Sequence, residues 1–135
     1  MKKVNRRSAL KIGLAAASAA VVKPVGAQIT DYTDTNPFPG VVMRAYRGEV
    51  PSLIPGFKTV SMRDIIFQPG SKNGTMPMMN AMVCHMLEGE LRHEQDGRTF
   101  VAKKNFAWTC NKGTKEQSFN DSNAVAIMRI TDLKE

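Results

Sequence analysis

Sulfur-bearing side chains are concentrated in one short stretch of this chain. Five of the nine methionines lie between positions 76 and 86, and one of the two cysteines lies among them. Thioether and thiolate sulfur are soft donors, which favour Cu(I) over Mg, Mn or Fe(II). A candidate soft-metal site therefore draws on five residues: Met76, Met78, Met82, Cys84 and Cys110.

A second interpretation of the same cluster needs no metal. Methionine fills irregular cores and makes favourable contacts with aromatic rings, so the cluster is also what an apolar, metal-free pocket would contain. The sequence leaves both interpretations open, together with a third in which other, unidentified residues hold a conventional metal ion. It also leaves open whether Cys84 and Cys110 are bridged, because an oxidising compartment would permit a disulfide but the spacing does not show its geometry.

Few other residues suggest chemistry. Two histidines in the whole chain exclude a three-histidine metal site, and no serine-hydrolase, zinc-protease, phosphate-loop or dinucleotide motif is present. Acid–base chemistry stays open through Glu116, Glu88, Glu90 or His85, and Glu116 is the main candidate among them. Glu116 could instead hold a cationic group of a ligand. His93 lies between acidic residues in a polar stretch, which predicts a solvated side chain.

The elements that must position these residues read as a series of short strands. Runs rich in β-branched, aromatic and apolar residues are separated by turn signals that contain Gly, Pro or Asp-Gly. No stripe of apolar residues repeats with the period of a helix. Asp96-Gly97 favours a type I′ hairpin turn. Positions 31–40 have no periodicity and are expected to be extended or irregular. Strands are predicted at 41–46, 59–67, 81–87, 91–95, 98–102, 106–110, 116–119 and 124–130.

The spacing of the methionine stretch resembles the first motif of the cupin superfamily. Gly70 is followed after five residues by Met76-Pro77-Met78, after three more by Met82, and after six more by Gly89. The cupin pattern has glycines at both ends, with two histidines and a glutamate where these methionines stand. The resemblance implies an all-β, single-domain jelly-roll sandwich or barrel. It does not carry over the usual iron, manganese or nickel site.

A weaker likeness continues into the second cupin motif. Gly113 and Asn120 match it, whereas Asn105 and Asn111 replace a glycine and a proline, and Glu116 replaces the histidine ligand. Together the two motifs cover about positions 60–132.

The cupin register predicts where the sulfur atoms lie. It directs Met76, Met78 and Met82 into the mouth of the barrel, and strand alternation places Cys84 on the same face as Met82. His85 is expected to face the other way. Cys110 is expected to approach from a neighbouring strand.

The N-terminus resembles a twin-arginine export signal. Arg6-Arg7 is followed by Leu10-Lys11 and by an apolar run over 12–22 that is too short to span a bilayer. We expect positions 1–27 to be removed, leaving a cupin domain over 28–135 in the periplasm. Six of the 19 basic residues belong to the leader, so the mature chain has 13 basic residues against 12 acidic ones, which removes any nucleic-acid signature.

These observations favour an exported cupin that binds a small ligand or a soft metal ion, of the Cu(I) kind, in the barrel mouth. Two other functions stay open. One is a metal-independent isomerase or lyase acting on a small polar substrate through Glu116. The other is a non-catalytic interaction subunit. The resemblance also implies a homodimer as one possible assembly, and no membrane span is expected in the mature chain.

Overall fold

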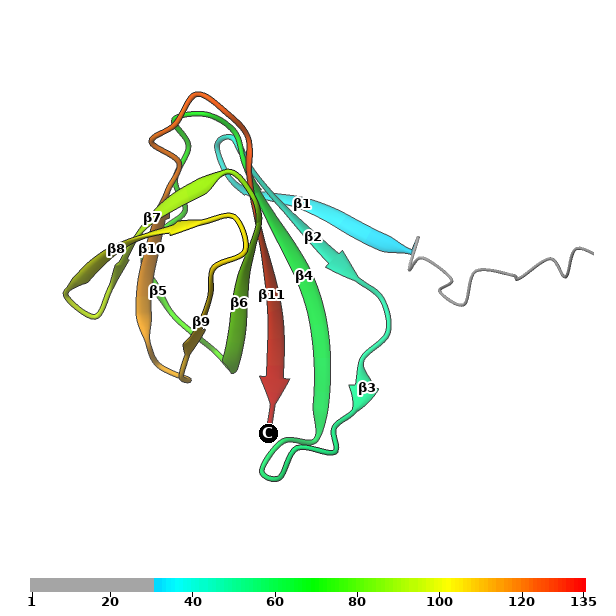
Figure 1. Ribbon diagram of the computed structural model, residues 1–135. Helices are drawn as coiled ribbons and strands as arrows, with labels where there is room; N and C mark the ends of the chain where they lie inside the picture. The colour runs from blue at the N-terminus through cyan, green and yellow to red at the C-terminus, as the bar shows by residue number, and fades with distance from the viewer. Residues whose placement is uncertain (1–30) are drawn as a thin grey trace, which may run out of the picture.

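A computed structural model describes residues 31–135, so the leader and the expected cleavage before Gln28 lie outside the described residues. Over this range the chain forms eleven strands and no helix (Figure 1). The all-β expectation is therefore confirmed. None of the described residues forms a helix with the length and hydropathy to cross a membrane.

The strands form two antiparallel sheets that face each other. The large sheet has the order β1-β2-β4-β11-β6-β9, with β3 paired to β4, and the small sheet has the order β5-β10-β7-β8. The strands of the large sheet are β1 (Tyr32–Phe38), β2 (Val41–Tyr46), β3 (Val50–Pro51), β4 (Thr59–Phe67), β6 (Ala81–Glu88), β9 (Ala107–Cys110) and β11 (Ala126–Lys134). Those of the small sheet are β5 (Met76–Pro77), β7 (Glu90–Gln95), β8 (Arg98–Lys103) and β10 (Lys115–Phe119).

The turn between β7 and β8 is the hairpin that Asp-Gly predicts. Gln95 pairs with Arg98 across the turn. Asp96 and Gly97 both have positive φ, at 45° and 78°. A type I′ turn requires positive φ at both central positions, so this prediction is confirmed.

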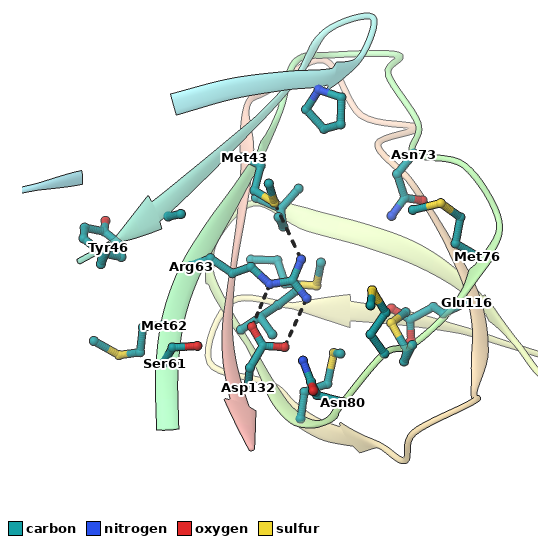
Figure 2. A pocket seen from close by; sticks show the side chains of 18 of the residues that line it. Met43, Tyr46, Ser61, Met62, Arg63, Asn73, Met76, Asn80, Glu116 and Asp132 are labelled. Atoms are coloured by element: carbon teal, nitrogen blue, oxygen red, sulfur yellow. Dashed lines mark hydrogen bonds and ion pairs between the residues drawn. The ribbon is translucent and has the colours of Figure 1, made fainter. Parts of the chain in front are cut away.

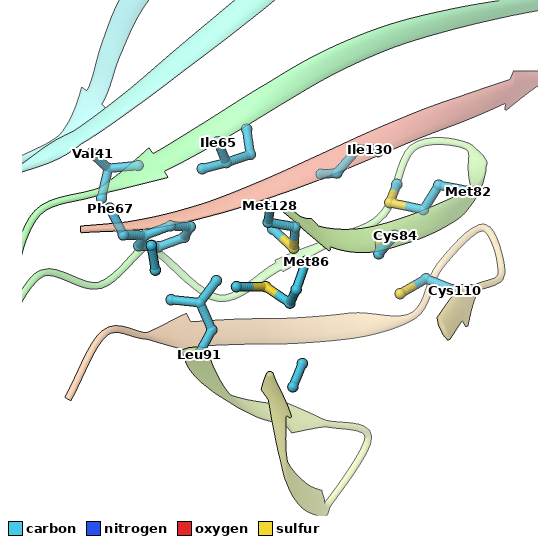
Figure 3. Packing of buried hydrophobic residues seen from close by; sticks show 12 residues of the cluster. Val41, Ile65, Phe67, Met82, Cys84, Met86, Leu91, Cys110, Met128 and Ile130 are labelled. Atoms are coloured by element: carbon cyan, nitrogen blue, oxygen red, sulfur yellow. The ribbon is translucent and has the colours of Figure 1, made fainter. Parts of the chain in front are cut away.

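The core lies between the two sheets and follows from strand alternation. On β6, Met82, Cys84 and Met86 are buried, whereas Val83 and His85, between them, are not. The large sheet adds inward side chains from β2, β4 and β11, and the small sheet adds two (Figure 3). The remaining buried apolar residues are Val41, Ile65, Phe67, Leu91, Ala102, Cys110, Ala126, Met128 and Ile130.

Asn120, one of the two residues that match the second motif, holds one end of the sandwich together. Its buried Nδ2 donates to the carbonyl oxygens of Phe67, Gln68 and Ala124, at 3.1, 3.2 and 2.8 Å. These carbonyls belong to the end of β4 and to the loop before β11. The asparagine therefore satisfies buried backbone acceptors that the sheets themselves leave free.

The sequence pattern missed the two-residue strands β3 and β5. It also missed one long element, β1, because positions 31–40 show no alternation. β1 is an edge strand and nearly all of it is exposed. The bidentate ion pair of Asp34 with Arg44 of β2 supports the pairing. Pro37 lies where the register shifts after Thr35, which is a position that a sheet tolerates for proline.

Candidate functional site

A pocket of about 690 Å³ opens between the large sheet and the segment that precedes β6. Its walls are mostly apolar, and Figure 2 shows Met43, Arg63, Asp132, Asn73, Met76 and Glu116 around it. The volume falls in the range of small-molecule sites. Seven of the eight methionines in the described residues line it: Met43, Met62, Met76, Met78, Met79, Met82 and Met128.

Three of the predicted sulfur donors lie on this wall. Met76 on β5 pairs directly with Glu116 on β10. The Met78 N–H donates to the Thr114 carbonyl at 2.9 Å, and the Gly113 N–H donates to the Met78 carbonyl at 2.7 Å. These backbone bonds fix the short segment against β10, so that its thioethers lie beside the pocket. Met82 is buried, whereas Met76 is 59% exposed.

The two cysteines are placed differently. Cys84 and Cys110 are buried free thiols, and neither lines the pocket. In the pairing of β6 with β9, Cys110 is opposite Met82, so the two cysteines are diagonal neighbours. A hydrogen bond with Cys110, burial, and the nearby Cys110 and Glu116 raise the pKa of the Cys84 thiol well above its usual range. The structure therefore separates the five candidate ligands into three pocket thioethers and two interior thiols.

Glu116 connects the pocket to these thiols. It lines the pocket and yet is only 2% exposed. Its Oε2 accepts from Gln95 Nε2 at 3.2 Å, from Trp108 Nε1 at 3.3 Å and from Cys110 Sγ at 3.4 Å. A carboxylate oxygen held by three donors is fixed in position. Glu116 is therefore a buried polar group that its neighbours hold in place. It differs in this from the solvent-exposed carboxylates that are usual on β-strands.

The expectation for His93 is wrong. Its side chain is fully buried, with Nδ1 3.0 Å from Ser118 Oγ and 3.4 Å from Glu116 Oε1. The ring lies against Phe100 and Trp108, with centroid distances of 5.0 and 4.5 Å. Nε2 has no hydrogen-bond partner among the described residues. The missed signal is the alternation that begins at the buried Leu91 and puts every second residue of β7 on the inner face.

Arg63 and Asp132 are pocket residues that the sequence reasoning missed. Arg63 Nε donates to Asp132 Oδ2 at 2.9 Å, and Nη2 donates to Oδ1 at 3.2 Å. Both lie on the concave face of the large sheet, on β4 and β11. Alternation from the buried Ile65 and Ile130 would have placed both inward. Their pairing joins positions 69 residues apart, which a local pattern does not reveal.

The conventional cupin metal chemistry does not fit this site. Residues 31–135 contain no group of three or more His, Cys, Asp or Glu side chains placed to hold a metal ion. Met76, Met78 and Met82 present thioethers where hard nitrogen and oxygen donors would be needed. We therefore derive no step through a hard metal ion.

Comparison with solved structures defines the fold of this chain. The cupin domain of Cnp3 from Schizosaccharomyces pombe has a TM-score of 0.64 at 16% identity and covers 82% of this chain and 74% of its own. An RmlC-like cupin from Shewanella frigidimarina NCIMB 400 has a TM-score of 0.61 at 13% identity, with coverage of 78% and 86%. KdgF from a Halomonas species has a TM-score of 0.60 at 11% identity, with coverage of 78% and 87%.

These likenesses show that the chain has the cupin jelly-roll fold in a single domain, as the motif resemblance predicted. No family model and no curated protein matches the sequence. Identities this low establish the fold alone, and one fold carries many functions. The function must therefore be argued from the pocket.

Proposed function

We propose that this cupin-fold domain binds a small, largely apolar organic molecule in its methionine-lined pocket. The observation that carries the proposal is the combination of a pocket of about 690 Å³ with a wall of seven methionines. Thioether side chains are flexible and polarizable, so they adapt to an irregular apolar ligand. Glu116 and the Arg63–Asp132 pair are the few polar groups that would orient it.

A soft metal ion is the second candidate, and a specific arrangement favours it. Met76, Met78 and Met82 line one pocket at the cupin ligand positions, and neutral thioethers suit Cu(I) without deprotonation. Cys84 and Cys110 would complete this set only if the interior rearranged, because neither reaches the pocket wall. The proposed copper site is therefore a three-thioether site.

NMR of protein labelled with [methyl-¹³C]methionine tests both candidates in one system. Met86 is an internal control, because it is fully buried and does not line this pocket. A library of small organic probes is expected to shift the methyl signals of Met43, Met78 and Met128 and to leave that of Met86 unchanged. If no probe shifts any pocket methyl signal, the organic-ligand proposal fails.

The copper proposal predicts a narrower response. Anaerobic titration with Cu(I), or with Ag(I) as a stable substitute, should shift Met76, Met78 and Met82 together at one equivalent. Replacing Met78 and Met82 by leucine keeps volume and apolarity while removing two thioethers. If this double variant binds Ag(I) as tightly as the parent protein does, the three thioethers are not the site.

Glu116 supports a catalytic alternative, a metal-independent isomerase or lyase. Its carboxyl group lines the pocket and is held by three donors, which suits a positioned acid or base. Once a substrate is known, Glu116→Gln should abolish turnover while leaving binding in place. Full turnover by that variant would exclude this role. A domain that takes up neither probe nor metal would favour the interaction-subunit alternative.

We also propose export to the periplasm, which rests on the twin-arginine leader. Protein recovered from a periplasmic fraction should begin at Gln28, and replacing Arg6 and Arg7 by lysine should retain the precursor in the cytoplasm. A homodimer paired through sheet edges is a further part of the proposal, since β1 is an edge strand of the large sheet among the described residues. Its test is the molar mass by light scattering.

A further inference from the structure

Within the described residues, the guanidinium group of Arg63 uses only part of its hydrogen-bonding capacity. Its Nε and Nη2 bind the two oxygens of Asp132. Within residues 31–135, the one hydrogen-bond acceptor of Nη1 is the thioether sulfur of Met43, at 3.7 Å. Figure 2 shows both interactions inside the pocket. A guanidinium carries five N–H donors, and thioether sulfur is a weak acceptor. At least two donors on the Nη1–Nη2 edge therefore have no oxygen acceptor within residues 31–135.

The surroundings leave this edge available to a ligand. The neighbours of Arg63 across the sheet are Ala45 on β2 and Ile130 on β11, and both are apolar. The Arg63 side chain keeps 27% of its surface exposed, whereas that of Asp132 keeps 7%. Because Arg63 and Ala45 both line the pocket, the exposed part of the guanidinium faces a cavity whose wall is otherwise largely thioether and hydrocarbon. A ligand atom placed there would need to be a hydrogen-bond acceptor.

The charges around the pocket argue against an anionic acceptor. Asp132 neutralises Arg63, and Glu49 forms an ion pair with Lys134 at the rim. The other lining cation, Arg47, pairs with Asp31. The remaining charged lining residue is the acid Glu116. A carboxylate or phosphate would therefore lose its hydration without gaining an uncompensated positive charge.

Resting on the proposed function, we propose that the ligand is an uncharged, largely apolar molecule with a carbonyl-type oxygen that accepts hydrogen bonds from the free edge of Arg63. The Asp132 carboxylate holds the guanidinium in place for this contact, because a bidentate pair fixes its plane. Arg63 is then the residue that separates carbonyl compounds from hydrocarbons and from organic acids of the same shape.

Three probes of matched shape test this assignment: acetophenone, ethylbenzene and benzoate. They share a phenyl ring and differ in carrying a neutral carbonyl, no acceptor or an anionic carboxylate. Dissociation constants come from the methionine methyl signals of the pocket. Acetophenone is expected to bind at least as tightly as ethylbenzene, although water solvates the ketone better, and more tightly than benzoate. A tighter benzoate, or a weaker ketone than hydrocarbon, overturns the inference.

A pair of double variants isolates the contribution of Arg63. Arg63→Met with Asp132→Leu removes the ion pair whole, because removing one partner would leave a buried charge. Arg44→Met with Asp34→Leu is the control. That pair is also bidentate, joins the neighbouring strands β1 and β2, and neither of its residues lines the pocket.

The affinity ratio of acetophenone to ethylbenzene is expected to fall about tenfold in the pocket variant, as for loss of a hydrogen bond to a charged group, and to stay unchanged in the control. An unchanged ratio in the pocket variant overturns the inference while leaving the proposed function standing. If none of the three probes shifts any pocket methyl signal, this inference fails, and the wider library of organic probes decides the proposed function. Should the pocket variant not fold, the ranking of the probes in the parent protein decides.

Discussion

Cys110 lies against Glu116, with Sγ 3.4 Å from Oε2, at the point where the pocket wall meets the interior. Gln95 Nε2 contacts both, at 3.0 Å from Cys110 Sγ and 3.2 Å from Glu116 Oε2. Trp108 Nε1 adds a third donor to the same oxygen. A group that lines the pocket is thus also the acceptor on which a buried polar cluster depends.

This dual role predicts the effect of two substitutions at Glu116. Glu116→Leu removes the carboxylate acceptor of Trp108 and Cys110 and leaves Gln95 Nε2 with only the Cys110 sulfur, so it should destabilise the fold by about 3 kcal/mol. Glu116→Gln keeps one oxygen that can take the position of Oε2 and should cost less than about 1 kcal/mol. Urea unfolding monitored by fluorescence of Trp108, the single tryptophan, measures both. Equal losses in the two variants would mean that the cluster does not depend on this acceptor.

Gly89 and Gly97 differ in a way that predicts unequal costs of substitution. Both have positive φ, at 68° and 78°. A Cβ at Gly89 would lie 2.7 Å from the Val125 carbonyl oxygen, whereas a Cβ at Gly97 would meet nothing within 4 Å. Gly97→Ala should therefore cost only the backbone strain, about 1 kcal/mol. Gly89→Ala adds a clash with backbone and should cost about 3 kcal/mol in all.

Chemical denaturation of the two alanine variants makes this comparison directly, with Gly97→Ala as the control for backbone strain alone. Similar losses at the two positions would show that the strand after Val125 yields to the added methyl group. Gly89 is the last residue of the motif spacing that indicated the fold. The Val125 carbonyl therefore accounts for the glycine at position 89 of this chain.

Most of the fold could be predicted because alternation and turn chemistry are local. β2 and β4 have the predicted bounds, 41–46 and 59–67, and the Asp-Gly turn has the predicted conformation. β1 could not be predicted in this way, since it is exposed and owes its place to pairing with β2. Its residues carry no apolar period, so the sequence pattern contains no signal for it.

The residues of the candidate site could likewise be predicted only in part. The motif spacing predicted that Met76, Met78 and Met82 would lie together, and all three line the pocket. The contact between Arg63 and Asp132 depends on the pairing of β4 with β11, which no local pattern encodes. The prediction that His93 is solvated is wrong, because it rests on the acidic neighbours and not on the alternation of the strand. Side chains that face inward among charged neighbours are the ones for which composition is a poor guide.

The pairing of Asp34 with Arg44 predicts an acid-sensitive contact on β1. A bidentate hydrogen bond from Arg44 lowers the pKa of Asp34. Desolvation opposes this shift, and the attraction between the two charges adds to it. Because the folded pKa is depressed, the contribution to stability is present above the ordinary value of 3.8 and is lost as the pH falls through the folded pKa.

Arg44→Gln should return the pKa of Asp34 towards 3.8 and speed amide exchange along β1. Carboxyl ¹³C NMR titration measures the first effect, and hydrogen exchange measures the second. Arg47→Gln is the control, since Arg47 pairs with Asp31 and should leave Asp34 unchanged. An Asp34 titration curve that does not move in Arg44→Gln would show that the ion pair does not set it.

The raised pKa of Cys84 predicts a loss of stability in alkali. Its causes are a hydrogen bond with Cys110, burial, and the nearby Cys110 and Glu116, with Arg63 opposing them. Above the ordinary value of 9.0 the unfolded chain releases this proton, whereas the folded protein keeps it. The unfolded state then binds fewer protons, so the free energy of unfolding falls as the pH rises, by about 1.4 kcal/mol per pH unit for one thiol. Below that pH both states are protonated and the contribution does not change.

Urea unfolding at several pH values from 7 to 10, under reducing conditions, tests this for the parent protein and for Cys84→Ala. The alanine variant is less stable at neutral pH because it leaves a cavity, but its stability should fall less steeply above pH 9. Tyr46 also has a raised pKa, from burial and from its hydrogen bond to Asp64, and its effect has the same sign at higher pH. Because both proteins contain Tyr46, the difference between the two curves isolates the thiol. Parallel curves would mean that Cys84 ionises as readily in the folded protein as in the unfolded chain, which would make it available as a thiolate beside Glu116.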